Sequence, residues 1–383
     1  ISSYSCLSAS LIVPLRAAGL CVATRKMFRS AALSSKYPSS GKEKACEDPL
    51  PLYEGRHVVP PFPSSPKWIP EKSWIRPEFS KTYDHSAFER EGYSFLRNFL
   101  TKDALEFLRA QVDHVWNYKH PTVQKAWIMN LHQVLPEKRN WVWKLATEPQ
   151  LLRTIEMHLG KDFVLNSAQI LIKPPVSKEE DGGRIVPWHQ DGQVIRTIWI
   201  CLDDVDEENG GLIVKPRWHR KGKMDVKEVK SYEAHLEGKP QFSIKDGDVS
   251  LATKKPRVPL NEIDYERYCP DGGREEFEKD KVQYRLRAGD AAMHHPSLPH
   301  MSMPNTSKEK RRRVIILRYL PARFIKPQGK YHQHWEDASL FQKHSFLVSG
   351  RDVCNQGFAK SPEEVQKKLC RVTVDTNENK NKN

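Results

Sequence analysis

The sequence has 383 residues, of which 38% are hydrophobic and 29% charged, and it contains ten tryptophans. Disordered chains lack this much apolar surface, so a folded protein of one large domain with appendages, or of two small domains, is predicted. The net charge is +14, from 62 basic and 48 acidic residues. No nucleic-acid-binding signature accompanies that charge, so we expect no nucleic-acid partner and favour a basic pocket or a well-solvated surface.

The seven cysteines are an odd number, and no two of them form a C-x-x-C pair. Such scattered cysteines are typical of free thiols in a reducing compartment and argue against a disulfide framework or a zinc ribbon. None has the Cys/His setting of a nucleophile, so thiol chemistry is not expected.

The leader, residues 1–46, is basic and poor in acids. Its first acidic residue is Glu43, and residues 1–50 hold seven Lys or Arg against three Asp or Glu. With its many Ser and Ala residues, this segment is typical of a transit peptide to a mitochondrion or plastid, the alternative being a disordered tail. If the leader is an artefact of an incomplete or upstream start, a cytoplasmic protein is expected. The apolar stretch 7–23 is broken by Arg16, so no membrane span is predicted.

Composition divides the rest of the chain into three parts. Residues 47–82 are rich in proline and are interpreted as an extended lead-in. The main domain is predicted to span 83–330, followed by a C-terminal extension, 331–383, whose last part is disordered. Inside the main domain, 221–281 is long, charged and weakly patterned, which is typical of an insertion or a lid.

Two helices are predicted ahead of the strands. The first begins after Thr101, a good N-cap residue, and the second runs from Pro149 to Leu159, with Gly160 just past its last turn. His158 lies in that last turn, where a cation suits the helix dipole, and we interpret it as structural.

After Gly160 the sequence consists of short β-rich runs separated by turn residues. The predicted strands are 163–173, 194–202, 211–215, 282–286 and 313–320. Helices first and many strands afterwards predict a mainly β fold, a sandwich or barrel with flanking helices, and not an alternating βαβ fold.

The strongest local motif is P-W-H-Q-D-G at 187–192. His189 and Asp191 are two residues apart, so on an extended segment both side chains leave the same face. An imidazole and a carboxylate are two of the three ligands of a two-His, one-carboxylate Fe(II) site. The pattern is short and weak alone. A similar H-x-E at 334–336 lies beyond the last predicted strand and is interpreted as a solvated polar stretch.

A third ligand has to come from farther along the chain, where His294, His295 and His300 compete. If the site also holds 2-oxoglutarate, an arginine is needed to pair with its far carboxylate. Arg311 lies eleven residues after His300, whereas Thr306 lies eleven residues after His295. The spacing favours His300 as the ligand and leaves His294 or His295 as a wall residue.

These motifs resemble those of the phytanoyl-CoA dioxygenase family of Fe(II)/2-oxoglutarate oxygenases. The H-Q-D at 189–191 matches the family's metal pair, and the H-x-S-x-x-N at 300–305, followed by Arg311, matches its distal signature. The segment T-I-W-I-C-L-D-D-V-D-E-E-N-G-G-L at 197–212 is also similar, and there Trp199 corresponds to an aromatic residue of the co-substrate pocket.

The resemblance covers about residues 85–325 and implies a double-stranded β-helix, or jelly roll, with a cupin-like core. The implied metal ligands are His189, Asp191 and His300. The implied 2-oxoglutarate contacts are Arg311, Trp199 and Asn305. Further pocket candidates are Gln169, Arg313 and His295. The three consecutive arginines, 311–313, leave open which one binds the carboxylate.

The chemistry implied by the resemblance is hydroxylation of a small organic substrate with O2, releasing succinate and CO2. Asp191 is present, so hydroxylation is expected and not halogenation. No protein residue need act as an acid or a base, and the basic charge balance favours an anionic substrate. Two alternatives stay open: a non-catalytic sensor or scaffold, and a cupin-type metal enzyme, such as an isomerase, that uses no co-substrate.

Overall fold

The computed structural model describes residues 72–79, 83–117, 127–133, 135, 137–177, 185–191, 194–229, 242–245, 248–251, 260–324 and 345–364. All of them belong to one unit, residues 46–383. The predicted leader, most of the proline-rich lead-in and the H-x-E at 334–336 lie outside the described residues. No helix in the described part of the chain is long and apolar enough to cross a membrane.

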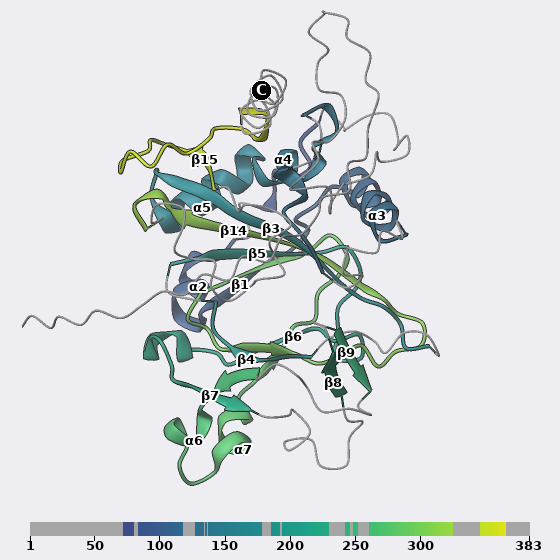
Figure 1. Ribbon diagram of the computed structural model, residues 1–383, viewed down its shortest axis with the longest axis vertical. Coiled ribbons are helices and arrows are strands. Elements are labelled where there is room, and N and C mark those ends of the chain that lie inside the picture. The colour runs from purple at the N-terminus through teal and green to yellow at the C-terminus, as the bar shows by residue number, and fades with distance from the viewer. Residues whose placement is uncertain are drawn as a thin grey trace, which may run out of the picture. The chain divides into compact units, whose positions relative to one another are not determined.

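The larger of two facing sheets has seven strands, all antiparallel to their neighbours (Figure 1). Its order is β1-β12-β5-β14-β3-β15, and β2 also pairs with β3. The strands are β1 (Tyr93–Leu96), β2 (Trp127–Met129), β3 (Phe163–Lys173), β5 (Arg196–Cys201), β12 (Ala291–His294), β14 (Arg312–Pro321) and β15 (Phe346–Ser349).

The smaller sheet has four strands in the order β11-β6-β13-β4. They are β4 (Val186–His189), β6 (Leu212–Val214), β11 (Val282–Gln283) and β13 (His300–Ser302). Among the described strands no pairing joins this sheet to the larger one, so the fold is a two-sheet sandwich and not a closed barrel. The predicted mainly β jelly-roll architecture with flanking helices is confirmed.

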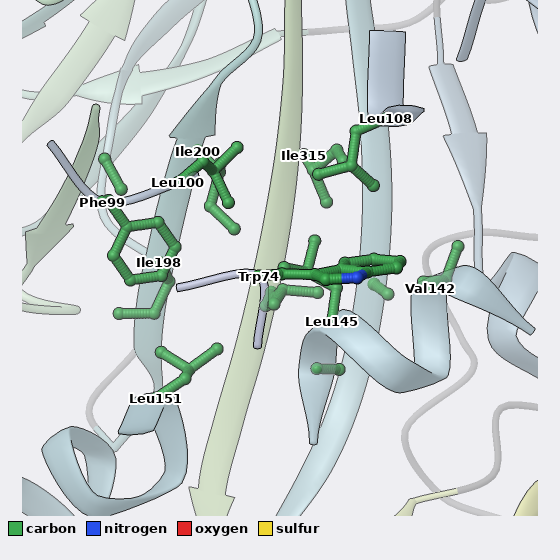
Figure 2. Packing of buried hydrophobic residues seen from close by; sticks show 14 of the residues in the cluster. Trp74, Phe99, Leu100, Leu108, Val142, Leu145, Leu151, Ile198, Ile200 and Ile315 are labelled. Carbon is green, nitrogen blue, oxygen red and sulfur yellow. The ribbon is translucent and has the colours of Figure 1, made fainter. Parts of the chain in front are cut away.

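Helices cover the outer face of the larger sheet (Figure 1). They are α2 (His85–Glu91), α3 (Lys102–Asn117), α4 (Trp141–Ala146) and α5 (Pro149–Leu159), with short 3-10 turns at Leu131–Gln133 and Glu137–Arg139. Figure 2 shows how Leu108 of α3, Leu145 of α4 and Leu151 of α5 converge with sheet residues around the buried Trp74. Burying each such side chain contributes about 1.5–3 kcal/mol, so this layer holds the sheet in place.

The two faces of β14 carry different cores because successive side chains on a strand alternate. Ile315 and Leu317 join the helix-covered core. Val314 and Ile316 instead join Trp199, Leu212 and other residues in a second core between the two sheets. The even-numbered residues of β14 therefore point into the sandwich, and the odd-numbered ones point toward the helices.

The described parts of the predicted insertion, 221–281, contain small elements of their own. They are β7 (Val226–Val229), β8 (Phe242–Lys245), β9 (Asp248–Leu251), β10 (Leu260–Ile263), α6 (Tyr265–Tyr268) and α7 (Gly273–Glu278), and the short turn η3 (Trp218–Lys221) leads into them. Strand β10 pairs with β7, and β8 pairs with β9. Tyr265 and Phe277 pack with Trp188 of β4 and Met301 of β13 in a third core. These helices thus cover one face of the smaller sheet.

Candidate metal centre

Two neighbouring strands of the smaller sheet bring His189 and His300 face to face. His189 ends β4 and His300 begins β13, where they are direct register partners with ring centroids 4.0 Å apart. Asp191 follows β4, and its backbone N–H donates to the carbonyl of Pro296 at 2.9 Å. The ligand atoms of His189, Asp191 and His300 lie within 4.8 Å of one another. The three residues nominated by sequence spacing therefore converge on one point.

Both histidines are held with their Nε2 atoms free of backbone bonds. Nδ1 of His189 lies 2.8 Å from the carbonyl oxygen of Pro187, and Nδ1 of His300 lies 2.9 Å from that of Leu298. A carbonyl oxygen only accepts, so each Nδ1 carries the hydrogen and each Nε2 has an open lone pair. Burial lowers the pKa of both imidazoles. Neutral imidazoles with second-nitrogen hydrogen bonds are the form that ligates metals.

The Asp191 carboxylate is ionised and oriented by residues that the motif did not reveal. Nη2 of Arg318 donates to Oδ1 at 2.7 Å, and Oγ1 of Thr197 donates to Oδ2 at 3.1 Å. Burial by itself would raise the pKa of the carboxyl, but Arg318 and the nearby histidines hold that pKa well below its usual range. Two neutral imidazoles and one anionic carboxylate make a donor set that fits Fe(II).

Of the adjacent histidines, His294 faces this centre and His295 does not. The His294 ring lies 4.7 Å from that of His300, and its Nε2 lies 3.5 Å from Oδ2 of Asp191. His295 instead packs near Phe88 and His219. Successive side chains alternate at the end of β12, so only one of the two can face inward. The prediction of His295 as a pocket residue is corrected to His294.

The three consecutive arginines are also divided between the two faces of the larger sheet. Arg311, the residue predicted from spacing, is exposed and pairs with Asp113 of α3 at 3.0 Å. Arg313 is buried on the same side, where it pairs with Asp203 and Asp113. Arg312 points into the sandwich, with Cζ 5.4 Å from the ring centroid of Trp199. The inward arginine is thus Arg312, one residue beyond the spacing prediction.

Arg312 lies beside a second buried cation. It is 0% exposed, and its register partner on β3, Lys173, is 1% exposed. Nη1 of Arg312 donates to the Gly210 carbonyl, but Nε and Nη2 are buried without a hydrogen-bond partner. Nζ of Lys173 donates to Oγ of Ser302 at 2.9 Å. Among the described residues neither cation has a carboxylate partner.

Burial lowers the pKa of both cations, that of Arg312 to about 10, and the charge of Arg312 adds to the effect on Lys173. Two adjacent buried cations are unfavourable unless an anion accompanies them. Ser302 stands two residues after His300 on β13, about 6.6 Å along the strand. This arrangement suits a ligand with one end at the triad and a carboxylate at Arg312.

The remaining predicted pocket residues differ in position. Trp199 is buried in the core between the sheets. Gln169 is buried on β3, two residues from Leu171, which packs against the same core, and we place it on the inner face. The Asn305 side chain hydrogen-bonds to the backbone: its Nδ2 donates to the carbonyl of Pro174 at 2.9 Å and to that of Lys310. Asn305 thus braces a loop.

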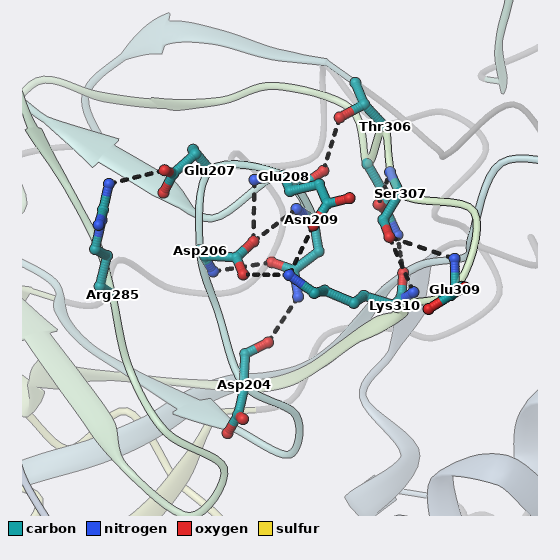
Figure 3. Close-up of polar contacts among 11 residues, drawn as sticks. Asp204, Asp206, Glu207, Glu208, Asn209, Arg285, Thr306, Ser307, Glu309 and Lys310 are labelled. Carbon is teal, nitrogen blue, oxygen red and sulfur yellow. Dashed lines mark hydrogen bonds and ion pairs between the residues drawn. The ribbon is translucent and has the colours of Figure 1, made fainter.

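Polar contacts hold residues 204–209 and the loop that follows β13 (Figure 3). The next residue, Gly210, accepts from Nη1 of Arg312 through its carbonyl. Nδ2 of Asn209 donates to the Asp204 carbonyl at 2.6 Å, and Nζ of Lys310 pairs with Asp206 at 2.9 Å. Thr306 donates to the Glu208 carbonyl at 3.0 Å. The first contact stabilises residues 204–209, and the other two join this segment to the loop after β13.

A sequence model of the family described as phytanoyl-CoA dioxygenase (PhyH) matches residues 88–314. The chain belongs to the phytanoyl-CoA dioxygenase family. That match includes every residue of the triad together with Arg312, and it confirms the predicted membership. Membership of this family supports the general assignment as an oxygenase and does not specify the substrate or the reaction.

Among curated proteins, the family member "Phytanoyl-CoA dioxygenase, peroxisomal" of Rattus norvegicus is 22% identical over 250 residues. The match covers 59% of this chain and 64% of the rat protein, so it spans less than two thirds of that relative.

Three of the solved structures to which the chain is similar are the following. The epimerase SnoN in complex with Fe3+, alpha ketoglutarate and nogalamycin RO has a TM-score of 0.43 at 18% identity, covering 62% of this chain and 82% of SnoN. The apo non-heme monooxygenase ThoJ has a TM-score of 0.47 at 18% identity, covering 76% and 94%. Apo EctD from S. alaskensis has a TM-score of 0.46 at 14% identity, covering 77% and 91%.

Proposed function

We propose that this protein is an Fe(II)- and 2-oxoglutarate-dependent dioxygenase that hydroxylates a small organic substrate. The observation that carries the proposal is the convergence of His189, Asp191 and His300 within 4.8 Å, with both Nδ1 atoms engaged by carbonyls. These three residues would hold the iron. The reaction consumes substrate, 2-oxoglutarate and O2, and yields the hydroxylated product, succinate and CO2.

When bound, the iron and 2-oxoglutarate supply the oxidising chemistry with O2. The residues of the chain bind and orient. Arg318 holds Oδ1 of Asp191, so Oδ2 faces His300. Trp199 and the other residues of the inner core keep water from the interior. No side chain is needed as a general acid or base.

We infer that Arg312, and not Arg311, binds the far carboxylate of 2-oxoglutarate. Its two unpartnered nitrogens offer the planar donor pair that a carboxylate accepts. Lys173 adds a second positive charge, and Trp199 forms a wall. Gln169 remains a pocket candidate on the same face as Lys173.

The substrate class we propose is a small organic anion. Arg318 lies at the triad, and its Nε is buried without a hydrogen-bond partner. A substrate carboxylate or phosphate could accept from that Nε–H. The net charge of +14 would favour the approach of such a substrate.

We also propose that residues 1–46 direct the protein to an organelle, on the basis of their basic, acid-poor composition. A fluorescent protein fused behind this segment should enter mitochondria or plastids. A diffuse cytoplasmic signal would contradict the proposal, and a peroxisomal signal would redirect it toward the location named for the rat relative.

The function is tested by anaerobic titration of Fe(II) into apoprotein with 2-oxoglutarate. We expect a weak visible charge-transfer band of the kind that a 2-oxoglutarate chelate of a facial-triad iron produces. The band should vanish in His189→Ala and His300→Ala. Arg312→Ala should require at least about tenfold more 2-oxoglutarate, since it removes a charge-assisted carboxylate contact.

Arg311→Ala is the matched control, because it removes the neighbouring guanidinium outside the sandwich. It should titrate like wild type. A folded wild-type protein that binds iron but shows no band would overturn the oxygenase proposal in favour of a co-substrate-independent metal protein or a scaffold. Loss of the band in Arg311→Ala, but not in Arg312→Ala, would overturn only the assignment of the arginine.

A further inference from the structure

A second cluster of metal-binding donors lies away from the triad. The ligand atoms of His85, Glu89 and His158 lie within 4.8 Å of one another. His85 and Glu89 belong to α2, and His158 belongs to the last turn of α5, so all three come from helices that flank the larger sheet. We propose that this cluster binds a divalent transition-metal ion, with Zn²⁺ as the best match, at a site independent of the iron centre.

Local structure places the three donors together. His85 and Glu89 are four residues apart on α2 and therefore share one helix face. The helix begins where Asp84 caps it, with the Ala87 N–H donating to Oδ1 of Asp84 at 2.9 Å. The His158 ring lies 4.7 Å from the His85 ring. The cluster thus joins two helices that are far apart in the sequence.

His158 is prepared to act as a ligand. Its Nε2 contacts the Tyr83 hydroxyl, while its Nδ1 is buried without a hydrogen-bond partner. Burial, followed by the charges of Arg196 and His85, lowers its pKa to about 3, so the ring is neutral near pH 7. In the tautomer with hydrogen on Nε2, that N–H donates to Tyr83 and the Nδ1 lone pair is open. Ligating histidines are usually oriented by such a second-nitrogen bond.

Charged groups of both signs surround the cluster. Glu89 and Asp84 are the carboxylates that act on Tyr83, and Arg196 is the guanidinium that acts on both Tyr83 and His158. Arg196 is turned over the ring of Phe88, with Cζ 5.6 Å from its centroid. Glu89, the carboxylate of the cluster, acts in turn on this guanidinium.

The geometry is close to that of a tetrahedral ion. Zn²⁺ lies about 2.0–2.2 Å from nitrogen and oxygen donors, which places the donors about 3.3–3.6 Å apart. The donor atoms here lie within 4.8 Å, so closure needs a movement of about 1 Å. His85 and Glu89 are exposed and can make that movement by side-chain rotation. Two imidazoles, one carboxylate and a water then complete the coordination shell.

Calorimetric titration of Zn²⁺ into the metal-free, full-length protein tests the proposal. Wild type should bind two equivalents, one at the triad and one at this cluster. His85→Ala and Glu89→Gln should each lose one equivalent, with affinity for it at least tenfold weaker. Both changes are at exposed positions, so folding should be preserved, as circular dichroism can verify. His189→Ala should lose the other equivalent and keep this one.

Glu91→Gln is the matched control, because it removes a carboxylate from the same helix that pairs instead with Arg90. It should bind two equivalents. The proposal is overturned if His189→Ala binds no Zn²⁺, or if His85→Ala and Glu89→Gln still bind as many equivalents as wild type. A wild-type protein that binds a single equivalent, which His189→Ala keeps and His85→Ala loses, would contradict the metal assignment of the triad and leave this proposal standing.

Discussion

Arg318 and Asp191 form an ion pair in which Nη2 of the arginine lies 2.7 Å from Oδ1 of the carboxylate. The other oxygen, Oδ2, lies 3.9 Å from Nε2 of His300. The two carboxylate oxygens therefore have different surroundings: Oδ1 pairs with a guanidinium, whereas Oδ2 accepts from Oγ1 of Thr197 at 3.1 Å and faces the histidines of the site. Arg318 lies on the inner face of β14, as Arg312 does, so one strand supplies the cations at both ends of the proposed 2-oxoglutarate site.

Because Arg318 binds Oδ1 and so orients Asp191, we predict that Arg318→Gln weakens Fe(II) binding. Substitution of a residue that orients a metal ligand typically lowers metal affinity by about 10–100-fold. We expect the affinity of Arg318→Gln for Fe(II) to fall about tenfold. Anaerobic Fe(II) titration of the apoprotein measures it. Arg323→Gln, at an exposed position beyond β14, is the control and should match wild type. Equal affinity in Arg318→Gln and wild type would show that Asp191 needs no such support.

From the buried cation pair we predict that Lys173→Met weakens co-substrate binding without lowering the stability of the fold. The change removes a charge from beside Arg312 but keeps the length of the side chain. The KM for 2-oxoglutarate, measured as succinate release, should rise about tenfold through loss of a charge-assisted contact. Thermal unfolding of the apoprotein should occur at an unchanged or higher temperature, because like charges no longer meet in the interior. A large drop in Tm with an unchanged KM would contradict both expectations.

His295 predicts a loss of stability in mild acid. Burial, then the charges of Arg196 and His219, lowers its pKa to about 3, and its Nδ1 accepts from the Ser297 N–H at 3.1 Å. Between pH 6.5 and 3 the unfolded chain takes up a proton that the folded state does not, so stability is full above the unfolded pKa and falls with pH below it.

The measurement is urea unfolding of the metal-free protein at pH 7 and pH 5. His295→Asn should reduce the difference in unfolding free energy between the two pH values. His114→Asn, at the end of α3, serves as the comparison. If the pH dependence in His295→Asn is as steep as in wild type, other groups cause it.

We predict that position 210, beside Arg312, requires glycine. Its φ is +73°, and a Cβ there would lie 3.0 Å from Cδ of Lys173 and closer still to the Met303 carbonyl. Gly210→Ala should therefore destabilise the protein by about 1–3 kcal/mol through strain and displacement. It should also raise the KM for 2-oxoglutarate, since the Gly210 carbonyl holds Arg312. Gly222→Ala, with a similar φ but open space around its Cβ, separates strain from crowding.

Much of the fold follows from local sequence pattern. The predicted helix at Pro149–Leu159 and the predicted strand at 163–173 have the same bounds in the structure. Both have strong local signals, a proline and a glycine at the helix ends and a long β-rich run in the strand. The short strands β12 and β13 were not predicted, because three or four residues carry little periodicity and pair through contacts distant in sequence.

The sequence by itself determined the family and the three residues that meet at the triad. These residues lie in short motifs that can be recognised, in their order along the chain, from the sequence alone. Only the tertiary structure decided which neighbour faces inward: Arg312 and not Arg311, and His294 and not His295. Side chains alternate at every residue of a strand, so a spacing argument that is wrong by one residue selects the opposite face. Arg318 and Lys173 belong to the site only through the register of β14 with β5 and β3, and that register is a property of the packed sheet.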